Sequence, residues 1–182
     1  MTAHPWPRML AAATGVHARL HEIEPAIHAP TRPRPPADAA SLLAFEHEAG
    51  HALPPGYRAF LLAADGWEHC YLRMSVFGLA ELRGGGPWSR AQELLRAYRD
   101  EEVLEHLGVE AHEVVPVAAG QRLHLVLAHR ADTDRAGEVM WIDAGALVGC
   151  YEDFRSWFAD LAWRKYRVLS RVEAGRAQGR GE

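Results

Sequence analysis

The segment FEHEAGHALPPGYRAFLLAADGW, residues 45–67, carries the two strongest structural signals in the sequence. Its HEAGH string, residues 47–51, has the spacing of two zinc-binding histidines on one helix face, with a glutamate to polarise a bound water. Its LPP string, residues 53–55, has prolines that suit a helix start, since the first turn needs no amide from them. The first signal predicts a zinc hydrolase and the second predicts two packed helices.

The residues on either side of the HEAGH string favour two short helices. Asp38 is a good N-cap for a helix from about residue 39 to 49, and Gly50 suits the left-handed residue that ends one. A second helix is expected to begin at Pro54-Pro55 and to stop at Asp65-Gly66. The residues expected to face the core, at helical spacing, are Leu42, Phe45 and Ala49 in the first helix and Tyr57, Phe60, Leu61 and Ala64 in the second.

Helical phase argues against the zinc site. At about 100° per residue, His47 lies about 200° and His51 about 240° from Phe45, so both histidines point away from the apolar stripe. The helix is also expected to end at Gly50, before His51. The zinc proteases that this string resembles need a nucleotide-binding domain, and the sequence contains no GxxxxGK[ST] loop. We therefore expect no metal and no cofactor, and two surface histidines.

The rest of the chain reads as helices, then strands, then a closing helix. Helices are expected over residues 6–27 and 88–107, and a final helix begins near Asp153. Four prolines between residues 28 and 36 predict an extended connector. The expected strands are 114–118, 123–129, 139–142 and 147–150. This order predicts an α+β fold in one domain, with helices packed on one face of a curved, mainly antiparallel sheet. The expected divisions are an N-terminal helix and connector (1–35), the main domain (36–172) and a disordered tail (173–182).

Composition limits the function. The chain has 182 residues and a formal net charge of −4, so no basic footprint predicts nucleic-acid binding. Two cysteines form neither a disulfide framework nor a cysteine zinc site and fit a reducing compartment. The N-terminus lacks a signal-peptide pattern, and no apolar run reaches the roughly 20 residues of a membrane span. We expect a cytoplasmic protein that does not bind membranes.

The segment 45–67 resembles the signature of the SUKH superfamily, which includes yeast cell-wall-synthesis regulators and many bacterial immunity proteins. The resemblance rests on Phe45-Glu46, Leu53-Pro54, the Tyr57-x-x-Phe60-Leu61 string and Asp65-Gly66. Three later strings resemble the family in the right order: VFGL at 76–79, GEVMWID at 137–143 and FRSWF at 154–158. The resemblance covers about residues 36–162. The turn around 132–137 is longer and more charged than is usual in the family, and the proline-rich arm is additional.

The resemblance implies a binding protein and not an enzyme. Bacterial members look like antidotes that bind a cognate toxin, often a nuclease or other secreted effector, which is encoded by an adjacent gene. We expect the chain to be such an immunity protein, and to be a monomer or weak dimer. A regulatory or scaffold module is the first alternative, and a zinc-dependent hydrolase using His47, Glu48 and His51 is the second.

Charge and aromatic content suggest where a partner would bind. Acidic residues are concentrated between Glu93 and Glu113, and an acidic face steers a basic partner, although a solvated helix face has the same pattern. Tryptophan is enriched at binding hot spots, so the candidate aromatic anchors are Trp67, Trp88 and Trp141. The same three residues could equally be core residues. The expected partner-binding residues are Trp67, Glu68, Glu101, Glu102 and Glu105.

Overall fold

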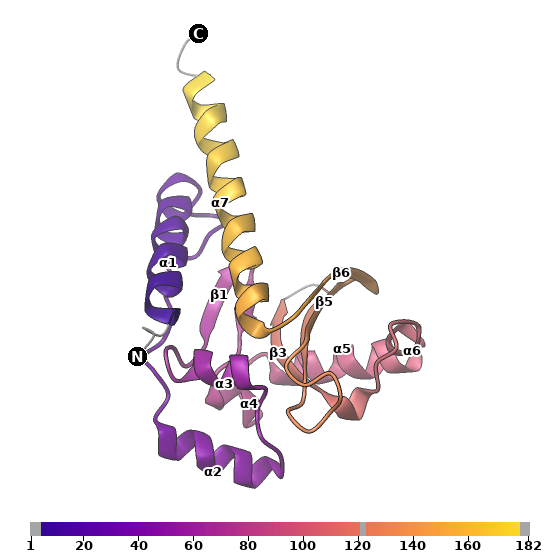
Figure 1. Cartoon of the computed structure of the whole chain (residues 1–182). Coiled ribbons are helices and arrows are strands. Elements are labelled where there is room, and N and C mark those ends of the chain that lie inside the picture. Colours follow the sequence, from indigo (N-terminus) through magenta and orange to yellow (C-terminus); the bar gives the residue numbers. More distant parts are fainter. Residues whose placement is uncertain (1–4, 121–122, 179–182) are drawn as a thin grey trace.

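The computed structural model describes residues 5–120 and 123–178 and forms an α+β domain around one six-stranded antiparallel sheet (Figure 1). The strands follow one another along the chain in the order β1-β2-β3-β4-β5-β6, so each strand pairs with its sequence neighbour. The predicted fold class is therefore confirmed.

Helix α1 (Trp6–Ile23) and the connector after it lie against the body of the domain. Trp6 is 2% exposed and contacts the rings of Phe60, Phe154 and Phe158. The helix was expected to reach residue 27 but ends at Ile23, since the residue before Pro25 disfavours helical geometry. The connector then runs extended, and its backbone pairs with the chain near residues 61–66.

Helices α2 (Ala39–Ala49) and α3 (Pro55–Leu61) form as the local rules predict. The Asp38 carboxylate accepts from the Ser41 amide at 2.9 Å, and Gly50 ends α2 with a φ of 71°. Leu53 lies between the two helices and is 1% exposed. One expectation was wrong: Ala49 is exposed, because α2 presents only Leu42 and Phe45 to the core.

The sheet begins with two short strands that the sequence signalled poorly. Strands β1 (Trp67–Tyr71) and β2 (Met74–Val76) form a hairpin, and α4 (Leu79–Leu82) follows directly. β1 was not predicted, and its register shifts near His69, which has a φ of 49°. Next come α5 (Trp88–Asp100), α6 (Val103–His106) and the short 3-10 helix η1 (Ala111–Glu113).

The predicted meander is confirmed within two residues at each strand end. Its strands are β3 (Val114–Gly120), β4 (His124–His129), β5 (Val139–Asp143) and β6 (Ala146–Tyr151). Successive residues of β3 to β5 are buried on both faces. Helix α7 (Phe154–Gln178) covers the face that carries Trp141, and α5 contacts β3 and β4. Together these helices bury the central strands.

Helix α7 is the longest element and stands beside α1 above the sheet (Figure 1). It continues to Gln178, so residues 173–178 of the expected disordered tail are helical, and residues 179–182 lie outside the described residues. Among the described residues, no helix combines the length and the apolar character needed to cross a membrane.

Candidate protein-binding site

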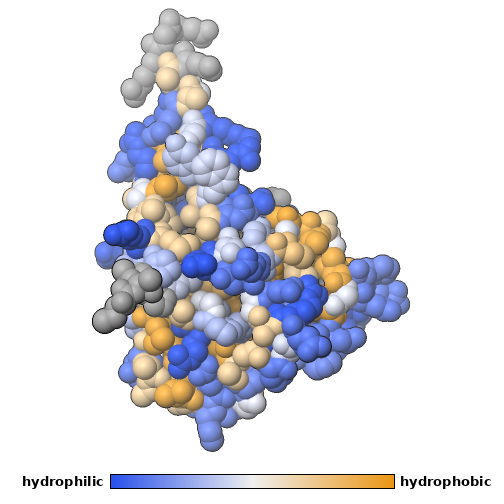
Figure 2. Space-filling view, in the orientation of Figure 1, coloured by the Kyte–Doolittle hydropathy of each residue, from blue (hydrophilic) through white to orange (hydrophobic). Residues whose placement is uncertain are grey.

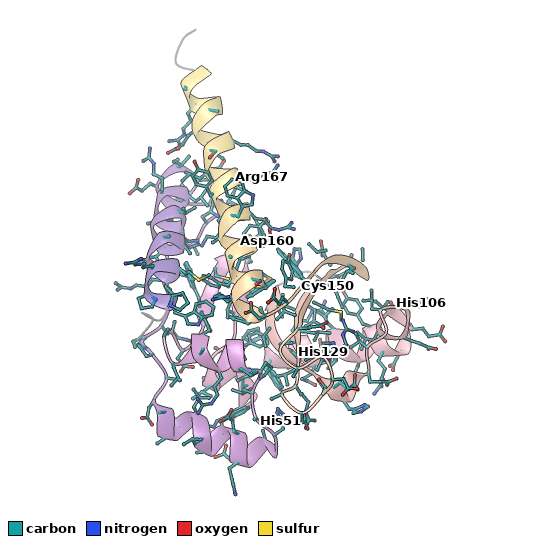
Figure 3. The ribbon with its side chains drawn as sticks, in the orientation of Figure 1. His51, His106, His129, Cys150, Asp160 and Arg167 are labelled. Atoms are coloured by element: carbon teal, nitrogen blue, oxygen red, sulfur yellow. The ribbon has the colours of Figure 1, made fainter. Side chains whose placement is uncertain are left out.

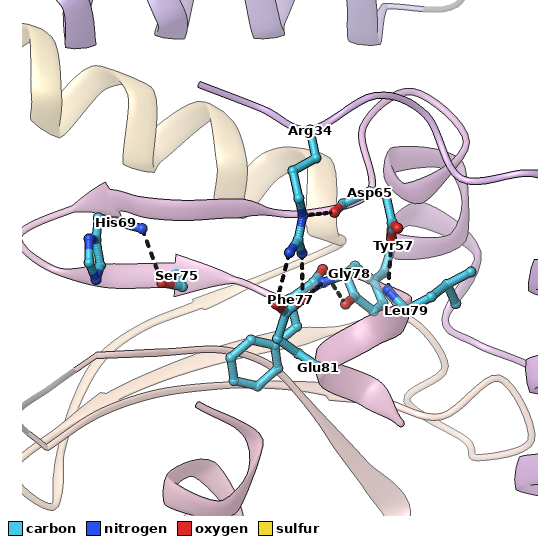
Figure 4. A network of polar contacts seen from close by, with 9 residues as sticks. All are labelled: Arg34, Tyr57, Asp65, His69, Ser75, Phe77, Gly78, Leu79 and Glu81. Atoms are coloured by element: carbon cyan, nitrogen blue, oxygen red, sulfur yellow. Dashed lines mark hydrogen bonds and ion pairs between the residues drawn. The ribbon is translucent and has the colours of Figure 1, made fainter. Parts of the chain in front are cut away.

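The Asp65–Gly66 turn is the centre of a polar network that fixes the start of the sheet (Figure 4). Arg34, from the connector, makes a two-pronged ion pair with Glu81, with one N–O distance of 2.9 Å, and also donates to the Asp65 carbonyl. The Asp65 carboxylate accepts from the Leu79 amide at 2.7 Å. The Glu81 carboxylate accepts from the Gly78 amide at 2.8 Å. One network therefore ties together the connector, the turn and α4.

Electrostatics show why this network holds Glu81 ionised. Burial alone would raise the pKa of Glu81, but the hydrogen bonds from Arg34 and the Gly78 amide outweigh it and hold that pKa below its ordinary value. The sequence interpretation missed both Arg34 and Glu81. For Arg34 a signal was present, because this arginine stands among the four prolines of the connector. Their partners within the fold give them a structural role and leave neither side chain directed at a binding partner.

The HEAGH string does not form the geometry of a zinc helix. His47 is exposed on the last turn of α2, whereas His51 lies beyond the helix end. Glu48 pairs with Arg83 at 3.3 Å. No three His, Cys, Asp or Glu side chains within the described ranges come together as a metal site. The preceding Glu46 has a clear structural role, because its carboxylate accepts from the Leu53 amide at 2.9 Å and pairs with Arg58 at 3.2 Å.

Trp67 is a core residue, and its assignment as a partner-binding residue was wrong. Its side chain is 1% exposed and lies between α1 and α7, where its indole N–H donates to the Thr31 hydroxyl at 3.3 Å. One other ring and one charge lie against it: the His17 ring at 5.4 Å between centroids and the Lys165 ammonium at 4.0 Å from the indole ring. Trp141 is likewise 2% exposed, which removes it as an anchor. Both indole rings fill space in the core between helix and sheet.

Buried ionisable groups cluster around Trp67. Lys165, the only lysine of the chain, is 2% exposed, and burial lowers its pKa to about 8. Burial, assisted by the Lys165 charge, lowers the pKa of His17 to about 4. His17 is held by the Ala29 carbonyl at 2.8 Å, so the cluster joins α1, the connector, β1 and α7. Its inaccessible position excludes a direct role in partner contact.

Three of the four predicted glutamates form one exposed surface. We define the acidic arm as Glu101, Glu102 and Glu105, which lie at the junction of α5 and α6. None of the three makes an ion pair with another described residue. Beneath the arm, Leu104 is 2% exposed and packs in the core, and the Tyr98 hydroxyl donates to the Leu123 carbonyl at 2.6 Å. His106, next to the arm, lies at the outer end of the α5–α6 region, apart from His51, which lies beside α2 (Figure 3).

Glu68, the fourth glutamate, lies apart from the acidic arm. Its side chain is 70% exposed on β1, which is one edge strand of the sheet. The acidic arm adjoins the turn between β5 and β6, near the other edge of the sheet. There, a β-carbon added at Gly145 would lie 3.7 Å from a methyl carbon of Val103. The predicted residues therefore make two separate surfaces and one core position (Figure 1).

An open groove that sequence reasoning did not anticipate lies beside the end of α2. Its volume is about 790 Å³, and apolar side chains from α2, α4 and α5 form its floor. Glu48, His51, Arg83, His112 and Arg130 add polar groups to its lining. Two of these belong to the HEAGH string, so that string lines a surface groove. The groove is lined by residues from segments far apart in the sequence, from α2 to β4, so no short motif could have revealed it.

Comparison with known proteins identifies the family but no individual relative. No curated protein matches the chain significantly. Residues 36–160 match the SMI1 / KNR4 family (SUKH-1), and this stretch includes the α2–α3 pair, the Asp65–Gly66 turn, the whole sheet and the start of α7. Since the match covers more than half of the chain, the protein belongs to the SMI1 / KNR4 family (SUKH-1).

Proposed function

We propose that the protein is an immunity protein that binds a cognate bacterial toxin and neutralises it by protein–protein interaction. The observation that carries this proposal is family membership over residues 36–160, because the superfamily includes many bacterial immunity proteins. The toxin is a nuclease or another secreted effector encoded by an adjacent gene. Neutralisation is by occlusion in the cytoplasm, with no catalytic step and no cofactor.

The exposed acidic arm supports a basic partner. Its three carboxylates lack ion-pair partners among the described residues, so their negative potential is directed to solvent. Such a potential raises the rate of encounter with a positively charged surface, and a nuclease needs a positive surface to hold its substrate. Leu104 and Tyr98 anchor the backbone that carries the arm, which limits the backbone freedom lost on binding.

Neutralisation in cells tests the proposal. The toxin domain encoded by the adjacent gene is expressed from an inducible promoter, alone and together with this protein. Growth arrest by the toxin alone and normal growth on co-expression is the expected result. A Tyr57→Asp variant, which places a charge at a position that is 0% exposed, controls for nonspecific effects of expression and should not rescue growth. Growth arrest that persists with the folded wild-type protein present contradicts the proposal.

A further inference from the structure

Strand β6 is an open edge of the sheet. It pairs with β5 on one side, and across the described ranges no backbone hydrogen bond joins residues 146–151 to any other segment. Figure 1 shows β6 at the rim of the molecule. Backbone N–H and C=O groups at alternate positions of β6 therefore face away from the sheet. Water can pair with them singly, but only another strand pairs with them in series.

The opposite edge of the sheet has protection that β6 lacks. Beside the start of β1 the connector runs along the chain, where the Arg34 amide donates to the Gly66 carbonyl at 3.0 Å. β1 itself carries the exposed charge of Glu68. Coverage and charge of this kind keep edge strands from pairing with other chains. The sequence of β6, ALVGCY, contains no charged residue and no proline, so β6 remains open to pairing.

The surface at β6 is apolar as well as unpaired. No residue of β6 is buried, whereas every residue of β3 is, and Leu147 is 44% exposed. Leu123, whose carbonyl accepts from the Ala144 amide in the β5–β6 turn, is 40% exposed. Figure 2 shows a hydrophobic area in the region of β6, next to a hydrophilic area over α6. The pairing with β5 slips by one residue beside Val148, which bends the strand without interrupting it.

The acidic arm lies beside the first end of β6. Gly145, the residue before the strand, donates its amide to the Tyr98 hydroxyl at 3.3 Å, which ties α5 to the β5–β6 turn. All three glutamates of the arm are exposed. The neighbouring Arg99 is paired with Asp100 at 2.7 Å, so it does not neutralise the arm. One end of this apolar edge therefore carries a concentrated negative charge.

These features define the chemistry of the partner. Each pair of neighbouring strands in the sheet is antiparallel, so a strand that continues the sheet runs antiparallel to β6. The C-terminal end of the added strand then lies beside the start of β6, next to the acidic arm. Charge complementarity requires basic residues at that end and an uncharged middle. A second copy of β6 does not fit, because β6 offers no positive charge to the arm.

We propose that the toxin adds a strand to β6, antiparallel to it, with basic residues at the C-terminal end of that strand beside the acidic arm. Main-chain hydrogen bonds provide affinity in such a contact, and the side chains provide specificity. This inference rests on the proposed immunity function, because it names the surface that binds the toxin. It assigns two roles to one site: the arm steers the toxin, and the open edge holds it.

Amide hydrogen exchange tests the strand addition, in the protein alone and in its complex with the toxin domain encoded by the adjacent gene. The outward-facing amides of β6 should exchange rapidly in the free protein and at least about tenfold more slowly in the complex. Amides of β1, at the opposite edge, should not change. A toxin that is bound and neutralised without slower exchange in β6 overturns the inference and leaves the immunity function standing. The absence of any complex overturns both.

Two matched variants test whether β6 is the surface that binds. Leu147→Lys on β6 and Leu43→Lys on α2 add the same charge at positions that are 44% and 60% exposed, so both should melt like the wild type. Leu147→Lys should weaken toxin binding at least about tenfold, because a lysine on an edge strand opposes pairing. Leu43→Lys should bind like the wild type. Equal affinities of the two variants would contradict the inference. Exchange in β6 that slows as the free protein is concentrated would show that a second copy covers the edge, which would also overturn it.

Discussion

At the scale of single residues, the fold depends on close approaches that only certain residues permit. Gly66 has a φ of 85°, and a β-carbon there would lie 2.7 Å from the Gly78 amide nitrogen and 2.8 Å from the Val76 carbonyl oxygen. The neighbours in contact are backbone atoms and the half-buried guanidinium of Arg34, which its ion pair with Glu81 holds in place, so they cannot move aside easily. The Asp-Gly dipeptide of the family signature is thus a packing requirement.

Gly66→Ala should lower the free energy of unfolding by about 2 kcal/mol or more, since it adds both a steric clash and a strained φ. Urea unfolding measures the change. Gly15→Ala is the matched control, because Gly15 lies inside α1 with no atom within 4 Å of an added β-carbon. It should raise stability by about 0.5–1 kcal/mol, as alanine does in a helix interior. Equal effects at the two glycines would refute the packing explanation.

The buried histidines predict that the protein loses stability in mild acid. The folded-state pKa of His17 is about 4 whereas its ordinary value is 6.5, so the unfolded chain binds a proton more readily between these values. The stability that the neutral ring contributes is present above pH 6.5 and is lost as the pH falls towards 4. Burial lowers the pKa of His28 and His129 as well, which adds to the loss in the same direction.

Urea unfolding at pH 7 and pH 5 should therefore show a drop in unfolding free energy on the order of 1 kcal/mol from His17. His17→Gln keeps a hydrogen-bond donor for the Ala29 carbonyl but does not titrate, so this variant should show a smaller drop. His47→Gln, at an exposed position, should behave like the wild type. A His17→Gln variant with the full wild-type drop would contradict this assignment.

At the scale of elements, helix-end rules predicted α2 and α3 well, because capping and proline effects act within a few residues. Strand β1 was missed since its sequence, WEHCY, has no β-branched residue and its irregular register leaves no alternation to detect. The near-continuous apolar content of β3 to β5 predicts that these strands are buried but does not identify the helices that cover them.

The α2 caps allow a direct test of these local rules. Asp38→Ala removes the acceptor for the Ser41 amide and should cost about 1 kcal/mol of unfolding free energy. His47→Ala, an exposed residue on the same helix, should change it by less than about 0.5 kcal/mol. Thermal or urea unfolding of the Asp38→Ala and His47→Ala variants, with and without added zinc, measures both changes in unfolding free energy. A His47→Ala loss that appears only in zinc would restore the metal interpretation.

At the scale of the whole molecule, candidate surfaces lie on separate elements: the acidic arm near one edge of the sheet, Glu68 at the other edge and the groove beside α2. The sequence alone was enough to select the acidic arm, because a concentration of acidic residues can be recognised without knowing the fold. Sequence reasoning selected Trp67 wrongly, since an isolated tryptophan gives the same signal in a core and at an interface. The groove depends on tertiary packing, because its lining comes from segments far apart in the sequence.

Charge reversal in the acidic arm tests its role in steering a toxin. Glu101→Lys with Glu105→Lys should slow association about tenfold or more at low salt, with a smaller effect at high salt. Asp134→Lys with Glu152→Lys makes the same change in net charge at exposed positions away from the arm. Stopped-flow association rates compare the two variants. Equal slowing by both pairs would mean that only net charge matters.

The most direct test of the central claim is titration of the purified toxin domain with this protein while the activity of the toxin is measured. The account predicts that activity falls linearly and ends at one molecule of this protein per toxin, with a stable complex of the two chains. Toxin activity that remains unchanged at a several-fold molar excess of folded protein would contradict the claim.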